Sequence, residues 1–112
     1  MTDRRTPPKH LKWATQRWWL HVVNTWELEE HHRRLATLAG EAWDRGRQAR
    51  EVLAEEGLTY EDRYGAPHPR PEVAIEKDSS IRYARLIREL DLDVEPPREA
   101  ARPPSLRAFN AS

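Results

Sequence analysis

Residues 35–53, LATLAGEAWDRGRQAREVL, decide the fold of this chain. Apolar and small residues recur there at spacings of three and four, and they are Leu35, Leu38, Ala39, Ala42, Gly46, Ala49 and Leu53. This spacing is that of one face of an α-helix. A glycine inside a helix costs about 1 kcal/mol relative to alanine. We therefore expect Gly46 and its small neighbours to let another helix approach closely.

The flanking sequence sets the limits of this helix and predicts a partner before it. Gly57 is a typical C-terminal cap, so the helix is expected to cover about residues 30–56. A short acidic connection precedes it and favours an antiparallel hairpin with an earlier helix at about residues 13–27. The apolar face of that earlier helix consists of Trp18, Trp19, Val22, Val23 and Trp26.

A third helix is predicted at about residues 71–91, with Pro71 suited to its first turn. Two i,i+4 pairs, Asp78 with Arg82 and Arg85 with Glu89, are expected to stabilise its charged face. Its broad apolar side contains Val73, Ile75, Tyr83, Ala84, Leu86, Ile87 and Leu90. Residues 58–70 contain Pro67 and Pro69, with Pro71 directly after them, and are predicted to form an irregular or β-like loop. The predicted fold class is therefore all-α.

The composition predicts a thin core and an oligomer. Hydrophobic residues make up 38% and charged residues 34% of 112 residues, so we expect partner chains to supply part of the burial. The expected organisation is a basic flexible arm at 1–10, a helical oligomerisation core at 11–93 and a proline-rich flexible tail at 94–112. The residues expected to pack in the oligomer are Trp18, Trp19, Val22, Trp26, Leu35, Ala39, Ala42, Gly46, Leu53, Tyr83, Leu86 and Leu90.

The formal net charge is zero, yet the charges are unevenly distributed. The first 21 residues hold five basic side chains and one acidic one, whereas the middle of the chain is acidic. A basic arm is a common electrostatic device for binding nucleic acid. The first candidates for DNA contact are Arg4, Arg5, Lys9, Lys12 and Arg17. The second candidates, on the mixed-charge face of the third helix, are Arg82, Arg85 and Arg88.

The sequence offers no pattern of catalytic residues, and we expect no enzyme, no cofactor and no metal site. Cysteine is absent, the four glycines are scattered, and neither a phosphate-binding loop nor a nucleophile motif is present. The adjacent His31 and His32 lack a ligand at i+4, and neighbouring helical side chains diverge by about 100°. No apolar run reaches the roughly 20 residues that span a membrane, and a cytoplasmic protein is expected.

Residues 10–93 resemble the terminase small subunits of tailed phages and prophages, particularly those of actinobacteria. The matching features occur in the family order: the pair Trp18-Trp19, the Ala-rich stretch LAGEAWDRGRQAREVLAEEG, the loop GLTY, His68-Pro69, and a last helix ending in RLIREL. Many members continue with a Gly-Leu-Thr-Pro-like stretch and a basic segment. Here the chain continues with DLDVEPP, which puts the role of the tail in doubt.

The resemblance implies a non-enzymatic component of a phage DNA-packaging motor in the host bacterial cytoplasm. Such subunits form homo-oligomeric rings, recognise viral double-stranded DNA, and recruit and regulate the terminase large subunit, which carries the ATPase and nuclease. We expect the C-terminal tail, with Leu106, Arg107 and Phe109, to contact the large subunit. Two alternatives stay open. One is a small dimeric helix-turn-helix regulator, and the other is a structural oligomer without a nucleic-acid role.

Overall fold

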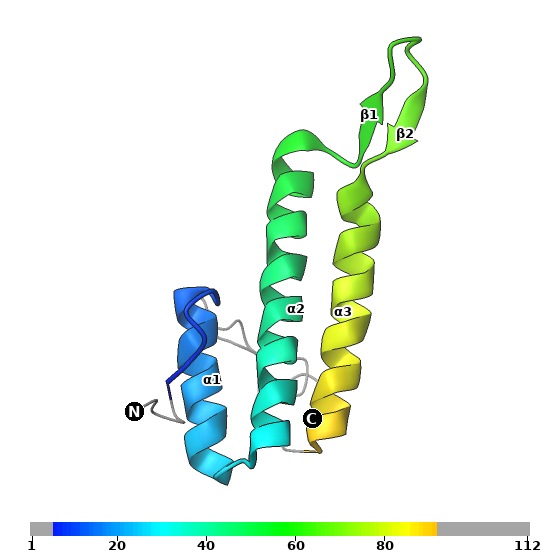
Figure 1. Cartoon of the computed structure of the whole chain (residues 1–112). Coiled ribbons are helices and arrows are strands. Elements are labelled where there is room, and N and C mark those ends of the chain that lie inside the picture. The colour runs from blue at the N-terminus through cyan, green and yellow to red at the C-terminus, as the bar shows by residue number, and fades with distance from the viewer. Residues whose placement is uncertain (1–5, 92–112) are drawn as a thin grey trace, which may run out of the picture.

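The computed structural model describes residues 6–91, and it contains three helices and one β-hairpin (Figure 1). The helices are α1 (Trp13–Trp26), α2 (Glu30–Glu56) and α3 (Pro71–Leu90). The strands β1 (Thr59–Glu61) and β2 (Pro67–Pro69) lie between α2 and α3. The three predicted helices and the β-like loop are confirmed.

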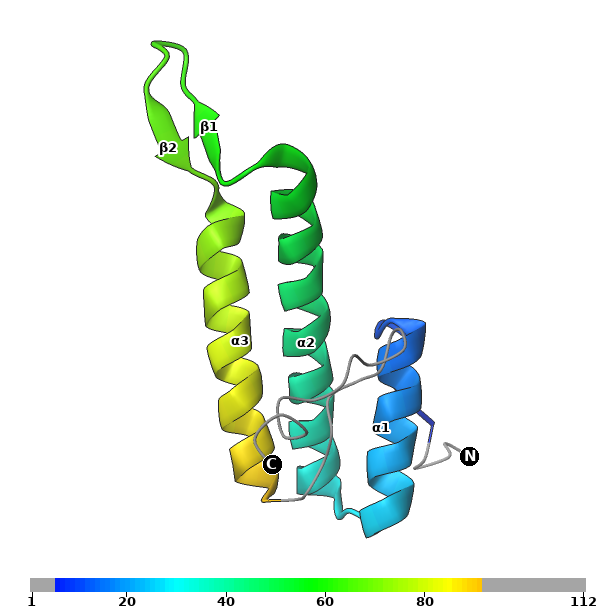
Figure 2. The same cartoon turned by 180° about the vertical axis from the view of Figure 1, so that it is seen from behind.

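Helices α2 and α3 run antiparallel and side by side along most of their length (Figures 1 and 2). The small-residue stripe of α2 faces α3: Ala42, Gly46 and Ala49 are buried, and a Cβ on Gly46 would lie 3.4 Å from the Cβ of Ser79. The close approach predicted from Gly46 is therefore made with α3, the partner more distant in sequence, rather than with α1.

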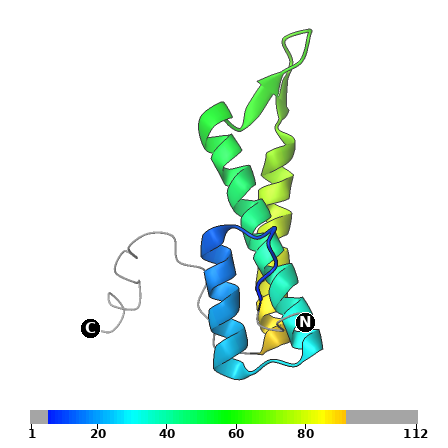
Figure 3. The same ribbon diagram turned by 60° about the vertical axis from the view of Figure 1, so that its left-hand side comes forward.

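A second face of α2 receives α1, which covers only the half of the α2–α3 pair nearer to the α1–α2 connection (Figures 1 and 3). Gly40 permits this contact, since a Cβ there would lie 3.0 Å from Cγ2 of Thr15 and 3.3 Å from Cδ1 of Leu11. The main apolar cluster lies in this half of the molecule. Its buried members are Leu11, Trp18, Trp19, Val22, Val23, Leu28, Ala36, Ala39 and Leu90.

The apolar side of α3 is buried only in part, which corrects the sequence prediction. Leu90 is buried, whereas Val73 and Ile75 keep 39% and 37% of their surface exposed. They belong to the half of α3 that lies beyond the end of α1, so α2 alone covers them (Figure 2). Ala84 is also exposed.

The charged face of α3 also differs from the prediction. Within residues 6–91, neither Asp78 with Arg82 nor Arg85 with Glu89 forms an ion pair. The cross-helix pair Arg50–Glu76, with 3.6 Å between Nε and Oε1, joins α2 to α3 instead. The arginines of α3 are therefore available for other contacts.

Three aromatic rings join the helices at the centre of the molecule. The ring of Tyr83 lies 5.0 Å from that of Trp43 on α2 and 6.4 Å from that of Trp18 on α1. Burial among these groups raises the pKa of Tyr83 to about 12, since removal from water disfavours the phenolate. Tyr83 of α3 thus contacts both other helices.

The β-hairpin projects beyond the ends of α2 and α3 (Figure 1), with Tyr60 paired opposite His68. Its turn is organised by the carboxylate of Asp62. One oxygen accepts hydrogen bonds from the backbone N–H groups of Tyr64 (2.8 Å) and Ala66 (3.0 Å), and the other lies 2.8 Å from Nε2 of His68. The bond with His68 and then the backbone bonds lower the pKa of Asp62.

Candidate nucleic-acid interface

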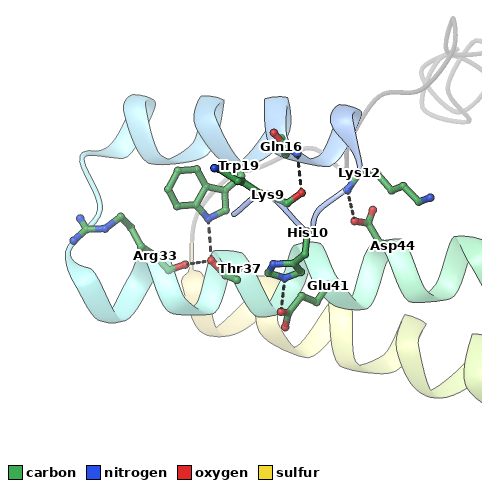
Figure 4. A network of polar contacts seen from close by, with 9 residues as sticks. All are labelled: Lys9, His10, Lys12, Gln16, Trp19, Arg33, Thr37, Glu41 and Asp44. Atoms are coloured by element: carbon green, nitrogen blue, oxygen red, sulfur yellow. Dashed lines mark hydrogen bonds and ion pairs between the residues drawn. The ribbon is translucent and has the colours of Figure 1, made fainter. Parts of the chain in front are cut away.

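The segment before α1 lies across α2 and is held there by both apolar and polar contacts (Figures 3 and 4). Leu11 is only 3% exposed, and it packs over Gly40. The preceding residue, His10, places Nε2 2.7 Å from Oε2 of Glu41. Residues 6–10 belong to the predicted basic arm, and this part of the arm thus contacts the helical core. The charged beginning of the arm, Arg4 and Arg5, lies outside the described residues.

The carboxylate of Asp44 on α2 accepts two hydrogen bonds from the beginning of α1. One carboxylate oxygen accepts a 2.8 Å hydrogen bond from the backbone N–H of Lys12, the N-cap residue of α1. The other accepts a 2.6 Å bond from the hydroxyl of Thr15, which is 1% exposed. The Lys12 side chain makes no cap of its own. A carboxylate at this position also suits the partial positive charge at a helix N-terminus.

These contacts form one wall of a shallow groove of about 340 Å³ between the N-terminal segment, α2 and α3. Three basic side chains from three different segments line it: Lys12 before α1, Arg45 on α2 and Arg82 on α3. We call these three residues the groove cations. Sequence reasoning placed Lys12 and Arg82 in two separate candidate sets, and the structure brings them to one site.

The groove cations are exposed, and none of them forms an ion pair within residues 6–91. The two acidic residues that also line the groove already have partners. Asp44 accepts from Lys12 and Thr15, and Glu41 contacts His10. Three cations against two carboxylates leave the lining of the groove with a positive balance, and the cations without ion pairs can turn toward an anion such as a phosphate.

Arg45 was missed by sequence reasoning. It lies on α2 outside the predicted packing stripe and is exposed, so periodicity alone gave it no role. The spacing of Leu38 and Arg45 by seven residues, two helical turns, is the signal that could have placed both on one face. Leu38 does line the same groove.

The remaining predicted DNA contacts within residues 6–91 are exposed but lie outside the lining of the groove. Lys9 is exposed, and the guanidinium of Arg17 lies 4.8 Å from the ring centre of the exposed Trp13. Arg85 and Arg88 are exposed on α3, and Arg85 follows Arg82 by about one helical turn. Arg82 and Arg85 therefore lie on neighbouring parts of the α3 surface.

The residues predicted to pack in an oligomer make their packing contacts mainly within this chain. Eight of the twelve are buried, namely Trp18, Trp19, Val22, Ala39, Ala42, Gly46, Leu53 and Leu90.

 The other four, Trp26, Leu35, Tyr83 and Leu86, are half-buried. Contacts within one chain account for their burial, so a contact between subunits stays a prediction. The large apolar residues that remain exposed are Trp13 at the beginning of α1, several residues in and beside the hairpin, and residues on the outer faces of α2 and α3.

No helix within residues 6–91 is both long and apolar enough to cross a membrane. No protein-family model matches the chain, and no similar curated protein or solved structure was found. The chain's own residues and their geometry therefore carry the functional assignment.

Proposed function

We propose that this chain is the small subunit of a phage packaging terminase, which binds viral double-stranded DNA and recruits and regulates the large ATPase and nuclease subunit. The sequence resemblance suggests this role. The observation that carries the proposal furthest is the meeting of Lys12, Arg45 and Arg82 at one groove while the acids beside them have other partners.

The groove cations suit the DNA backbone better than the base edges. They come from three segments and surround a shallow groove, so they can contact phosphates without a helix entering the major groove. Phosphate contacts fix the position of a protein on DNA and add affinity irrespective of sequence. Arg85, next to Arg82 on α3, would extend this contact along the backbone.

A homo-oligomeric ring would present the groove once in each subunit, so weak individual sites would act together. Because the predicted packing residues are used within the chain, we assign the contact between subunits to apolar residues that remain exposed. The exposed side chains on the half of the molecule that α1 leaves uncovered are Leu58, Tyr60, Tyr64, Val73 and Ile75.

Fluorescence anisotropy with labelled double-stranded DNA tests the proposal. Replacing all three groove cations with alanine should weaken binding by at least about tenfold, since each lost phosphate contact removes a favourable ionic interaction. A matched control replaces Arg50, Arg63 and Lys77, which do not line the groove, and should bind nearly as tightly as the unaltered protein. Equal affinity of the groove variant and the unaltered protein would reject the DNA site.

Light scattering tests the ring separately from DNA binding. The chain has a mass of 13.2 kDa, and a ring predicts a particle of several times this mass. A monomer or dimer under all conditions would contradict the ring, and it would favour the regulator alternative. That alternative has a structural difficulty, because the centre of α2 is buried against α3 at Gly46 and could not serve as a recognition helix.

A further inference from the structure

A cluster of possible metal ligands lies at the connection between α1 and α2, away from the groove. Glu29, His31 and His32 each contribute one ligand atom, and these atoms lie within 4.8 Å of one another. The two imidazole rings have their centres 4.0 Å apart, and Nδ1 of His31 lies 3.7 Å from Oε2 of Glu29. We call these three residues the histidine cluster.

The histidine cluster lies at the beginning of α2, where one of its three residues is outside the helix. The sequence predicted no metal site because neighbouring side chains inside a helix diverge. His31 and His32 lie in the first turn of α2, and their side chains are turned so that the ring centres lie 4.0 Å apart. Glu29 precedes the helix with an extended backbone, so its side chain is not bound to helical spacing.

We propose that the histidine cluster binds a divalent transition-metal ion of the zinc or nickel class. Two imidazoles and one carboxylate form a ligand set that such ions favour, with a further position open to water or another group. Zinc–nitrogen bonds of about 2.0–2.1 Å in a tetrahedron place donor atoms roughly 3.3 Å apart. The 3.7 Å pair of Glu29 and His31 is already close to this spacing, and the ligand atom of His32 lies within 4.8 Å of both.

Neighbouring charges favour a cation at this position. Glu27, two residues before Glu29, adds negative potential that opposes the partial positive charge of the α2 N-terminus. The nearby cations have other contacts: Arg33 donates to the backbone oxygen of Leu28 at 2.6 Å, and Arg34 pairs with Glu30 at 3.3 Å.

The other histidines of the chain are separate from this cluster. His10 contacts Glu41 and His68 contacts Asp62, while the ring of His21 meets the edge of Trp26. His21 is exposed and is therefore a suitable control position. A metal ion bound by the histidine cluster would tie the α1–α2 connection to the first turn of α2, so it should stabilise the folded chain.

Isothermal titration calorimetry of the tag-free full chain with Zn²⁺ at pH 7.5 tests the proposal. We expect one bound ion per chain and a rise in the melting temperature with added Zn²⁺. His31→Ala combined with His32→Ala should weaken binding by more than the roughly tenfold that loss of an outer-shell partner costs. Glu29→Gln should weaken it as well, whereas His21→Ala should leave it unchanged. Mg²⁺, which prefers oxygen ligands, should not compete.

Amide shifts in nuclear magnetic resonance spectra of the unaltered protein give a readout that needs no variant, and those of residues 29–32 should change most on addition of Zn²⁺. The proposal is overturned if the unaltered protein does not bind Zn²⁺, if the double variant binds it equally well, or if His21→Ala removes binding to the same extent.

Discussion

Thr15 of α1 and Gly40 of α2 pack so closely that a methyl group on Gly40 would lie 3.0 Å from Cγ2 of Thr15. Gly40→Ala should therefore destabilise the protein, because the new methyl group must displace buried groups of α1. Overpacking of this kind costs about 1–3 kcal/mol, against a gain of up to about 1 kcal/mol in helix propensity. Urea unfolding followed by circular dichroism should show a net loss of about 1 kcal/mol or more.

Gly46→Ala is the matched control on the opposite packing face of α2. Its new Cβ would lie 3.4 Å from the Cβ of Ser79, which is an ordinary van der Waals contact. The gain in helix propensity should then dominate, and the variant should be as stable as the unaltered protein or more stable by up to about 1 kcal/mol. An equal loss of stability at both glycines would contradict the difference between the two interfaces.

Asp44 is expected to contribute stability through the beginning of α1. Asp44→Ala removes the acceptor of the buried Thr15 hydroxyl, and an unsatisfied buried group of this kind costs about 1–3 kcal/mol. In a Thr15→Val background no hydroxyl is left without a partner, so Asp44→Ala should cost clearly less. A double-mutant cycle measured by urea unfolding checks this, and an equal cost in both backgrounds would contradict the proposed capping role.

The helices could be predicted from the sequence because local signals mark them. Pro71 suits the start of α3, Gly57 suits the end of α2, and the apolar periodicity between such signals is strong. The predicted range of about 30–56 for the second helix agrees with the observed Glu30–Glu56. These signals act within a few residues, so they need no knowledge of which helices pack together.

The arrangement of the helices and the site could not be predicted in the same way. The small residues around Gly46 indicated a close helix partner, but only the fold shows that this partner is α3. The fold also shows that Gly40 allows the close contact with α1. The contacts of Asp44 with Lys12 and Thr15 span about 30 residues of sequence. Arg45 joins the groove for the same reason, since its neighbours come from segments distant in the chain.

The order of the β-hairpin should depend on the ionised carboxylate of Asp62. Its pKa is lowered in the folded chain relative to about 3.9 in an unfolded one. Its contribution is therefore present above about pH 4 and is lost as pH falls through the lower folded value. Amide exchange, corrected for intrinsic rates, should show protection of Tyr64 and Ala66 falling in this range.

Asp62→Asn is the control for this pH dependence. The variant lacks the titrating group, so protection of the two turn amides should be weaker at neutral pH and should change little between pH 5 and the acid range. The helices, which do not depend on this contact, should keep their circular dichroism signal. A pH dependence equal to that of the unaltered protein would assign the effect to another group.

Tyr83 should make the protein sensitive to alkaline pH. Its pKa is raised to about 12 in the folded chain, against about 10 when unfolded. Because the folded state keeps the proton to higher pH, this contribution to stability is complete below about pH 10 and is lost as pH rises toward 12. Urea unfolding at pH 9 and pH 11 should show a larger loss for the unaltered protein than for Tyr83→Phe. Equal losses would contradict the burial of this hydroxyl.

The salt dependence of DNA binding tests the central claim most directly. The logarithm of the binding constant should fall linearly with the logarithm of salt concentration for the unaltered protein, because phosphate contacts release counterions. Replacing Lys12, Arg45 and Arg82 with alanine should reduce the slope by about three units per bound chain, or about one for each lost contact. The matched variant at Arg50, Arg63 and Lys77 should keep the original slope. The same slope in all three proteins would contradict DNA binding at this groove.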